Sequence, residues 1–98
     1  MVEKFFYLVY TIFMKMWLKV YSNDKMKKNT VFETDDDISV SDFLLAFSTA
    51  ADAVDSPTPI ILDSHVKKLN NFGIVRFYPD DFVEFVPFDK LELEIMRS

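Results

Sequence analysis

The sequence contains no cysteine, one glycine (Gly73) and one histidine (His65). The lack of cysteine excludes disulfides, thiol nucleophiles, iron–sulfur clusters and cysteine-type zinc sites. A single glycine excludes the glycine-rich loops that cradle phosphate groups. No HExxH motif and no second histidine accompanies His65, so we interpret it as a surface or helix-packing residue without a partner. These absences lead us to predict no enzyme activity, no metal site and no cofactor.

What the sequence does contain is sufficient for one folded domain. Its 98 residues are 50% hydrophobic and include eleven phenylalanines, and each large ring can bury roughly 150–250 Å² in a core. This length supports one hydrophobic core and not two. The absence of cysteine also fits a reducing compartment, so we expect a cytoplasmic protein.

The net charge of −5 is divided unevenly along the chain. Residues 1–28 hold six basic and two acidic side chains, whereas residues 29–98 hold five basic and fourteen acidic ones. Nucleic-acid binding requires a concentrated basic surface, so the acidic body argues against a nucleic-acid partner. The basic front could instead attract an anionic partner, a membrane surface or the acidic body itself.

Residues 1–14 form an apolar segment that allows three interpretations. Apolar side chains recur at helical spacing between Val2 and Val20, which favours an amphipathic or core helix. The uninterrupted apolar run is only about half of the ~20 residues that a spanning helix needs, so residues 1–20 would make only a marginal membrane anchor. The third interpretation is an extra strand or a non-native extension. We therefore divide the chain into this ambiguous segment and a single small α+β domain at 15–98.

Two helices are expected in the middle of the chain. Ser39 can cap the first, which should run to about Val54. The second is expected between Pro59 and Phe72, with Thr58 as its cap and Gly73 as its stop. The side chains expected to face the core are Phe43, Leu44, Phe47, Ala50, Ala51 and Val54 in the first helix and Ile61, Leu62, Val66, Leu69 and Phe72 in the second.

Extended segments flank the helices. Residues 16–22 alternate in polarity and residues 30–34 form a return strand after a turn at 22–25, which predicts a β-hairpin. After the helices, residues 74–78, 82–88 and 91–96 are rich in β-branched, aromatic or alternating residues, although Pro79 could instead begin one helical turn. We therefore predict an α+β fold with an N-terminal β-hairpin, a helix pair, and two or three C-terminal strands. The strands should form one mainly antiparallel sheet covered on one face by helices.

Two surfaces are candidates for function. Residues 82–86 place hydrophobic side chains on both faces of a strand, so one set should be exposed or buried by a partner. We assign this candidate interaction surface to Trp17, Phe82, Phe85 and Phe88. The second candidate is an acidic surface formed by Glu33, Asp35, Asp36, Asp37, Asp80, Asp81 and Glu84. The run from 35 to 37 lacks the glycine and closing glutamate of a calcium loop, and its carboxylates suit the N-terminus of the helix that follows.

Our leading hypothesis is a non-enzymatic protein–protein interaction or accessory module. It would act through an apolar aromatic sheet surface with an acidic rim, and bind a partner protein or a second copy of itself. One alternative is a small acidic inhibitor that mimics nucleic acid, which requires the acidic residues to converge on one surface. Another is a peripheral membrane protein anchored by residues 1–20.

Overall fold

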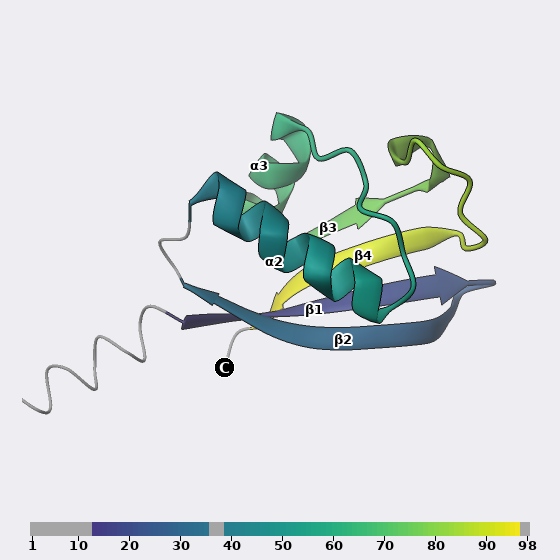
Figure 1. Cartoon of the computed structure of the whole chain (residues 1–98), viewed down its shortest axis with the longest axis horizontal. Helices are drawn as coiled ribbons and strands as arrows, with labels where there is room; N and C mark the ends of the chain where they lie inside the picture. The colour runs from purple at the N-terminus through teal and green to yellow at the C-terminus, as the bar shows by residue number, and fades with distance from the viewer. Residues whose placement is uncertain (1–12, 36–38, 97–98) are drawn as a thin grey trace, which may run out of the picture.

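The computed structural model describes residues 13–35 and 39–96. Four strands form one antiparallel sheet in the order β2-β1-β4-β3, with two helices beside it (Figure 1). The elements in chain order are β1 (Phe13–Ser22), β2 (Lys25–Asp35), α2 (Val40–Ala53), α3 (Asp63–Phe72), β3 (Ile74–Phe77), the 3-10 turn η1 (Pro79–Asp81) and β4 (Lys90–Met96). The predicted α+β class, with a hairpin, a helix pair and two C-terminal strands, is confirmed.

The hairpin of β1 and β2 supplies one edge strand and one inner strand of the sheet. Its turn residues Asn23 and Asp24 have φ angles of 53° and 62°. Asn and Asp tolerate this left-handed conformation better than most residues, and two positive φ angles in succession suit the twist of a hairpin. β1 then pairs with β2 along one edge and with β4 along the other, so it is an inner strand.

The two faces of the sheet differ in polarity. On the inner face Leu18 of β1 lies opposite Leu93 of β4, which in turn lies opposite Val75 of β3, and all three are buried. The next position along β1 and β4 pairs Lys19 with Glu92. Because successive side chains of a strand point to opposite faces, this charged pair lies on the outer face.

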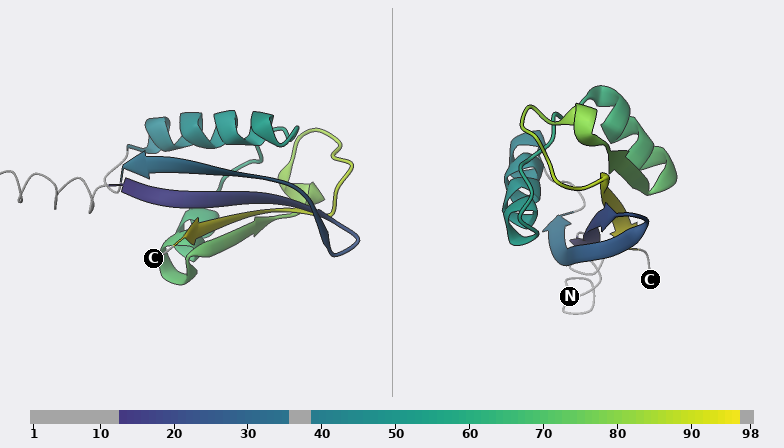
Figure 2. Two further views of the ribbon diagram at one scale, coloured as in Figure 1. Left: turned by 90° about the horizontal axis from the view of Figure 1, so that it is seen from below. Right: turned by 90° about the vertical axis from the view of Figure 1, so that its right-hand side faces the viewer.

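Both helices pack on the inner face (Figure 2). α2 lies against β2, and α3 lies against β3 and β4. Phe47 of α2 is fully buried and meets Phe77 of β3 edge-on, with ring centroids 5.7 Å apart. Leu69 of α3 shares a small hollow with Leu93 on the sheet. The expected covering of one sheet face by helices is therefore confirmed.

Two helix boundaries follow the predicted chemistry. The Ser39 hydroxyl accepts a hydrogen bond from the Asp42 amide at 3.2 Å and caps α2. Gly73 ends α3 with a φ of 74°, a conformation that costs least at glycine. Its amide donates to the Leu69 carbonyl at 2.8 Å, and its carbonyl accepts from the Ile95 amide at 2.7 Å. The end of α3 is thereby bonded directly to β4.

The predicted start of the second helix is wrong. α3 begins at Asp63, so Thr58 does not cap it and Pro59 lies before it. The reason is tertiary: the Ile60 amide donates to the carbonyl of Asp81 at 2.7 Å, which holds the preceding segment in a non-helical path. The sequence around the helix contains no sign of this bond, because its acceptor lies in η1.

The predicted strand at 82–88 is also absent from the described fold. η1 is the single helical turn that Pro79 allowed, and the residues between η1 and β4 form a loop. Pro87 has no amide hydrogen to contribute to a β-ladder, which disfavours a strand there. The loop is fixed at its end by Asp89, whose amide donates to the Tyr21 carbonyl at 2.9 Å and whose carboxylate accepts from the Asn23 amide at 2.6 Å.

Candidate docking groove

The structure separates the four aromatic residues of the predicted interaction surface. Phe82 and Phe88 are each 8% exposed, and their rings meet edge to face with centroids 5.6 Å apart. Because the loop turns them into the core, they do not form the exposed sheet surface that we expected. Phe85 lies between them and is 90% exposed. Trp17 is on the outer face of β1, with the Lys19 ammonium 4.2 Å from its ring centroid.

The candidate acidic residues do not converge. Glu33 and Asp35 lie at the end of β2 that pairs with the start of β1. Asp80, Asp81 and Glu84 follow β3 in the chain. The last residue of β3 pairs with β4, and its partner in β4 pairs in turn with β1 near the opposite end of that strand. Seven strand positions separate the two ends, roughly 23 Å at about 3.3 Å per residue. Asp36 and Asp37 lie outside the described residues. The described carboxylates thus form two distant groups and not one surface.

The possible membrane anchor falls mostly outside the described residues, which begin at Phe13. Residues 13–20 belong to β1, so they do not extend an anchoring helix. Within the described ranges, no helix is both long and apolar enough to cross a membrane.

His65 has partners, contrary to our prediction. Its ring is largely buried against Phe77, with ring centroids 4.6 Å apart. Nδ1 accepts a hydrogen bond of 2.9 Å from the Leu62 amide, so this nitrogen bears no proton here. Nε2 lies 3.7 Å from one carboxylate oxygen of Asp81, and the other oxygen accepts from the Tyr78 amide at 2.8 Å. Nδ1 therefore caps the start of α3, and Nε2 faces Asp81 of η1.

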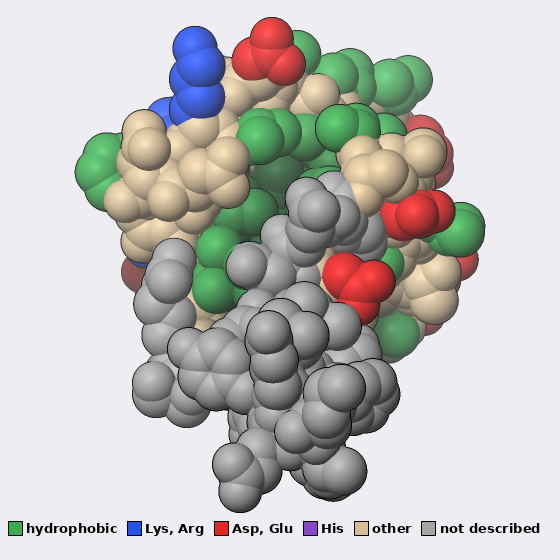
Figure 3. All heavy atoms as spheres, turned by 90° about the vertical axis from the view of Figure 1, so that its left-hand side faces the viewer, with side chains coloured by type: hydrophobic (Ala, Val, Ile, Leu, Met, Phe, Trp, Pro, Cys, Tyr) green, Lys and Arg blue, Asp and Glu red, His purple; other side chains and the backbone are tan. Residues whose placement is uncertain are grey.

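A groove opens between α2 and α3 at the end of the molecule where β1 begins (Figure 3). Its volume is about 400 Å³. Four exposed apolar side chains form its walls, Val40 and Leu44 from α2 and Leu62 and Val66 from the start of α3. The other described residues that line it are Met14, Met16, Thr34, Asp35, Ser39, Phe43, Ile61, Asp63, Leu69, Asn70 and Ile95. We call this hollow the α2–α3 groove.

The α2–α3 groove has few polar groups, and those that carry a charge are acidic. Asp35 and Asp63 line it, and none of its described lining residues is Lys or Arg. Thr34 also lines it, is 4% exposed, and has a hydroxyl with no hydrogen-bond partner among the described residues. A buried polar atom without a partner costs about 1–3 kcal/mol, so such atoms call for an explanation. The groove is thus apolar, with an acidic rim and one unpaired hydroxyl.

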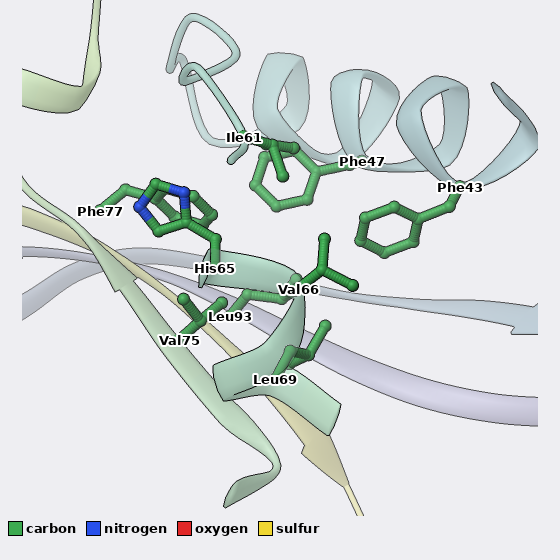
Figure 4. Close-up of a pocket in the computed structure, with 9 residues that line it drawn as sticks. All are labelled: Phe43, Phe47, Ile61, His65, Val66, Leu69, Val75, Phe77 and Leu93. Carbon is green, nitrogen blue, oxygen red and sulfur yellow. The ribbon is translucent and has the colours of Figure 1, made fainter. Parts of the chain in front are cut away.

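A smaller hollow of about 10 Å³ lies where the groove meets the core. Phe43, Ile61, Val66 and Leu69 line both spaces, so the two are adjacent. Figure 4 shows that its lining side chains come from both helices and from the sheet, and that His65 lies against Phe77 at its edge. This volume admits about one water-sized sphere and no larger ligand. The space available to a ligand is therefore the groove itself.

The outer face carries a compact chain of paired charges. The Lys19 ammonium lies 2.8 Å from Glu92 and 2.6 Å from Glu94, and the second oxygen of Glu92 accepts from Arg76 at 2.8 Å. Burial acts to lower the pKa of Lys19, but the two glutamates outweigh it and raise that pKa above its ordinary value. Burial likewise acts to raise the pKa of Glu92, but Lys19 and Arg76 outweigh it and hold that pKa below its ordinary value. Each of these charges is therefore already balanced within the fold.

Sequence reasoning missed the residues of the groove. Leu44, Leu62 and Val66 were assigned to the buried stripes of the helices, but Leu44 is 40% exposed and Val66 42%. Phe72 was also expected to face the core and is instead exposed. The signal that could have revealed the groove is the breadth of these stripes, since Phe43 and Leu44 are both apolar at adjacent positions. One narrow sheet cannot cover so wide an apolar surface on two helices.

Comparisons of the chain with protein-family models, with curated proteins and with solved structures find no match. The function is therefore argued from the geometry of the groove.

Proposed function

We propose that this protein is a non-enzymatic interaction module that binds a partner protein in the α2–α3 groove. The observation that carries the proposal is the exposure of four apolar side chains, Val40, Leu44, Leu62 and Val66, around one concave surface. Scattered exposed apolar residues need no explanation, but a continuous concave group of them is typical of a binding site. This surface replaces the aromatic sheet surface, because Phe82 and Phe88 are buried.

The chemistry of the groove indicates the kind of partner. Its walls are two helices, and an apolar stripe of a third helix is the ligand that such a groove most readily accepts. Asp35 and Asp63 at the rim favour lysine or arginine beside that stripe, mainly by raising the association rate and the specificity. We therefore propose a partner segment of two to three helical turns, apolar on one side and flanked by basic residues.

Photo-crosslinking tests this proposal in the full-length protein. A benzophenone amino acid would replace Leu44 in the groove or, as the matched control, Val31, an exposed apolar residue of β2 outside the groove. The proteins would be exposed to extracts of the source cells, and the crosslinked peptides sequenced by mass spectrometry. We expect adducts at position 44 that contain an apolar segment with flanking Lys or Arg, and few at position 31.

The captured segment is then synthesised and titrated. Leu44→Asp places a third carboxylate beside an apolar wall and should weaken binding by about tenfold or more, whereas Val31→Asp should leave it within about twofold. Three results would contradict the proposal: equal crosslinking at both positions, adducts only to a second copy of the chain, or equal binding by the two variants.

A further inference from the structure

We infer that the α2–α3 groove is also the docking site of the chain's own residues 1–12, which compete there with the partner. This inference rests on the proposed function, because it concerns the occupancy of the same groove. It is carried by three observations: where the chain enters the described fold, the composition of the residues before that point, and the polarity of the groove.

The chain enters the fold at the mouth of the groove. Met14 and Met16, near the start of β1, line the groove, and Phe13 is in register with Asp35, another lining residue. Residues immediately before Phe13 therefore need no linker to reach the apolar walls. A tethered segment of this kind has an effective concentration in the millimolar range, so that even weak intrinsic affinity keeps it bound.

The sequence of this segment matches the apolar character of the groove. Residues 1–12 read MVEKFFYLVYTI, with apolar or aromatic side chains at most positions and one side chain of each charge, Glu3 and Lys4. The hydroxyls of Tyr7, Tyr10 and Thr11 are groups that could pair with the buried hydroxyl of Thr34.

Paramagnetic relaxation in the full-length protein tests the inference. Because the chain has no cysteine, Val9→Cys creates the only thiol for a nitroxide label. We expect the amide signals of Leu44 and Val66 to lose most of their intensity, while signals at the hairpin tip keep theirs. The matched control is a label at Lys27→Cys in the exposed β2, which should spare the groove signals.

Two further measurements show whether the segment binds in its own chain and in the groove. In the first, a chain that carries the nitroxide but no isotope is mixed with a chain that carries the isotope but no nitroxide, so that only the second chain gives signals. The groove signals should then keep their intensity, because the label is on another molecule. If they still lose intensity, a second copy supplies the segment and the inference is overturned. Adding Leu44→Asp to the labelled chain should restore the signal of Val66. The inference is also overturned if the label at position 9 does not broaden the groove signals, whatever partner is captured at Leu44. Conversely, if residues 1–12 bind in the groove but crosslinking at Leu44 captures no partner, only the proposed function is contradicted.

Discussion

At the end of the sheet where β3 stops, the inner face is covered by the loop between η1 and β4, whereas at the end where β1 begins it opens as the α2–α3 groove. The closed end contains the inward pair Phe82 and Phe88 and the contacts that His65 makes with η1. The open end contains exposed leucines and valines and the unpaired hydroxyl of Thr34. The same kind of apolar side chain thus contributes to folding at one end and is available for binding at the other.

The difference teaches which residues should matter for stability and which for binding. Apolar area stabilises the fold only to the extent that it is removed from water, at about 25 cal/mol per Å². Residues at the closed end should therefore dominate the free energy of unfolding. If the proposed function holds, replacing residues of the groove should have small effects on unfolding and large effects on association.

The largest expected effect is from Phe88→Ala at the closed end. Removing a buried ring that packs edge to face on Phe82 should lower the free energy of unfolding by about 3–5 kcal/mol. The control is Phe85→Ala on the same loop, which should change it by no more than about 0.5 kcal/mol because that ring is exposed. Chemical denaturation of the two variants measures both values.

A matched change at the open end sharpens the comparison. Leu44→Ala should cost clearly less than Phe88→Ala, since part of the Leu44 side chain already faces water. If Leu44→Ala proves as destabilising as Phe88→Ala, the groove is part of the core and the contrast between the two ends is lost.

An intermediate effect is expected from Glu92→Gln on the outer face of the sheet. It removes the charge that pairs with Lys19 and Arg76, and hydrogen bonds to charged groups contribute about 1.5–3 kcal/mol each. We expect a loss of about 2–3 kcal/mol at pH 7 by denaturation. Amide hydrogen exchange should show that both ends are destabilised to the same extent, because β1 and β4 are common to them.

The pH dependence of this variant has a defined sign. The pKa of Glu92 is lowered in the fold, so its stabilisation is present above the ordinary glutamate pKa and is lost as the pH falls through the lowered value. The difference between wild type and Glu92→Gln should therefore shrink below about pH 4. The pKa of Lys19 is raised, so its contribution is complete below the ordinary lysine pKa and lost only above about pH 10.4. A difference that stays constant down to pH 2 would contradict this account.

The smallest effect concerns the hydrogen bond that His65 accepts at the start of α3. His65→Leu keeps an apolar side chain against Phe77 but removes the acceptor of the Leu62 amide, and should cost about 1–2 kcal/mol. His65→Asn is the control, because its side-chain oxygen can take the place of Nδ1 and should recover part of this loss. Equal destabilisation by both would show that the packing of the ring, and not the hydrogen bond to Nδ1, stabilises the start of α3.

Local chemistry allowed the prediction of those elements whose ends are determined locally. Ser39 caps α2 with an amide three residues away, and Gly73 supplies the positive φ that ends α3. Both signals are complete within a few residues of sequence. The hairpin turn at Asn23 and Asp24 is of the same kind.

The features that sequence did not predict depend on partners far along the chain. The start of α3 depends on a bond from Ile60 to Asp81, and the partners of His65 include that same aspartate. The burial of Phe82 and Phe88, and the exposure of Leu44 and Val66, depend on where the loop folds over the sheet. Periodicity gives the apolar positions of an element but not the extent of the surface that covers them.

The antiparallel pairing of β1 with β4 has a consequence for how this fold could be carried by other proteins. Lys15 is in register with Met96, so the path into the described fold and the path out of it are neighbours at one end of the sheet. A domain with adjacent entry and exit can be inserted into a surface loop of a host protein without separating the ends of that loop. This domain is therefore well suited to use as an insert, in which the groove would face the host at the point of attachment.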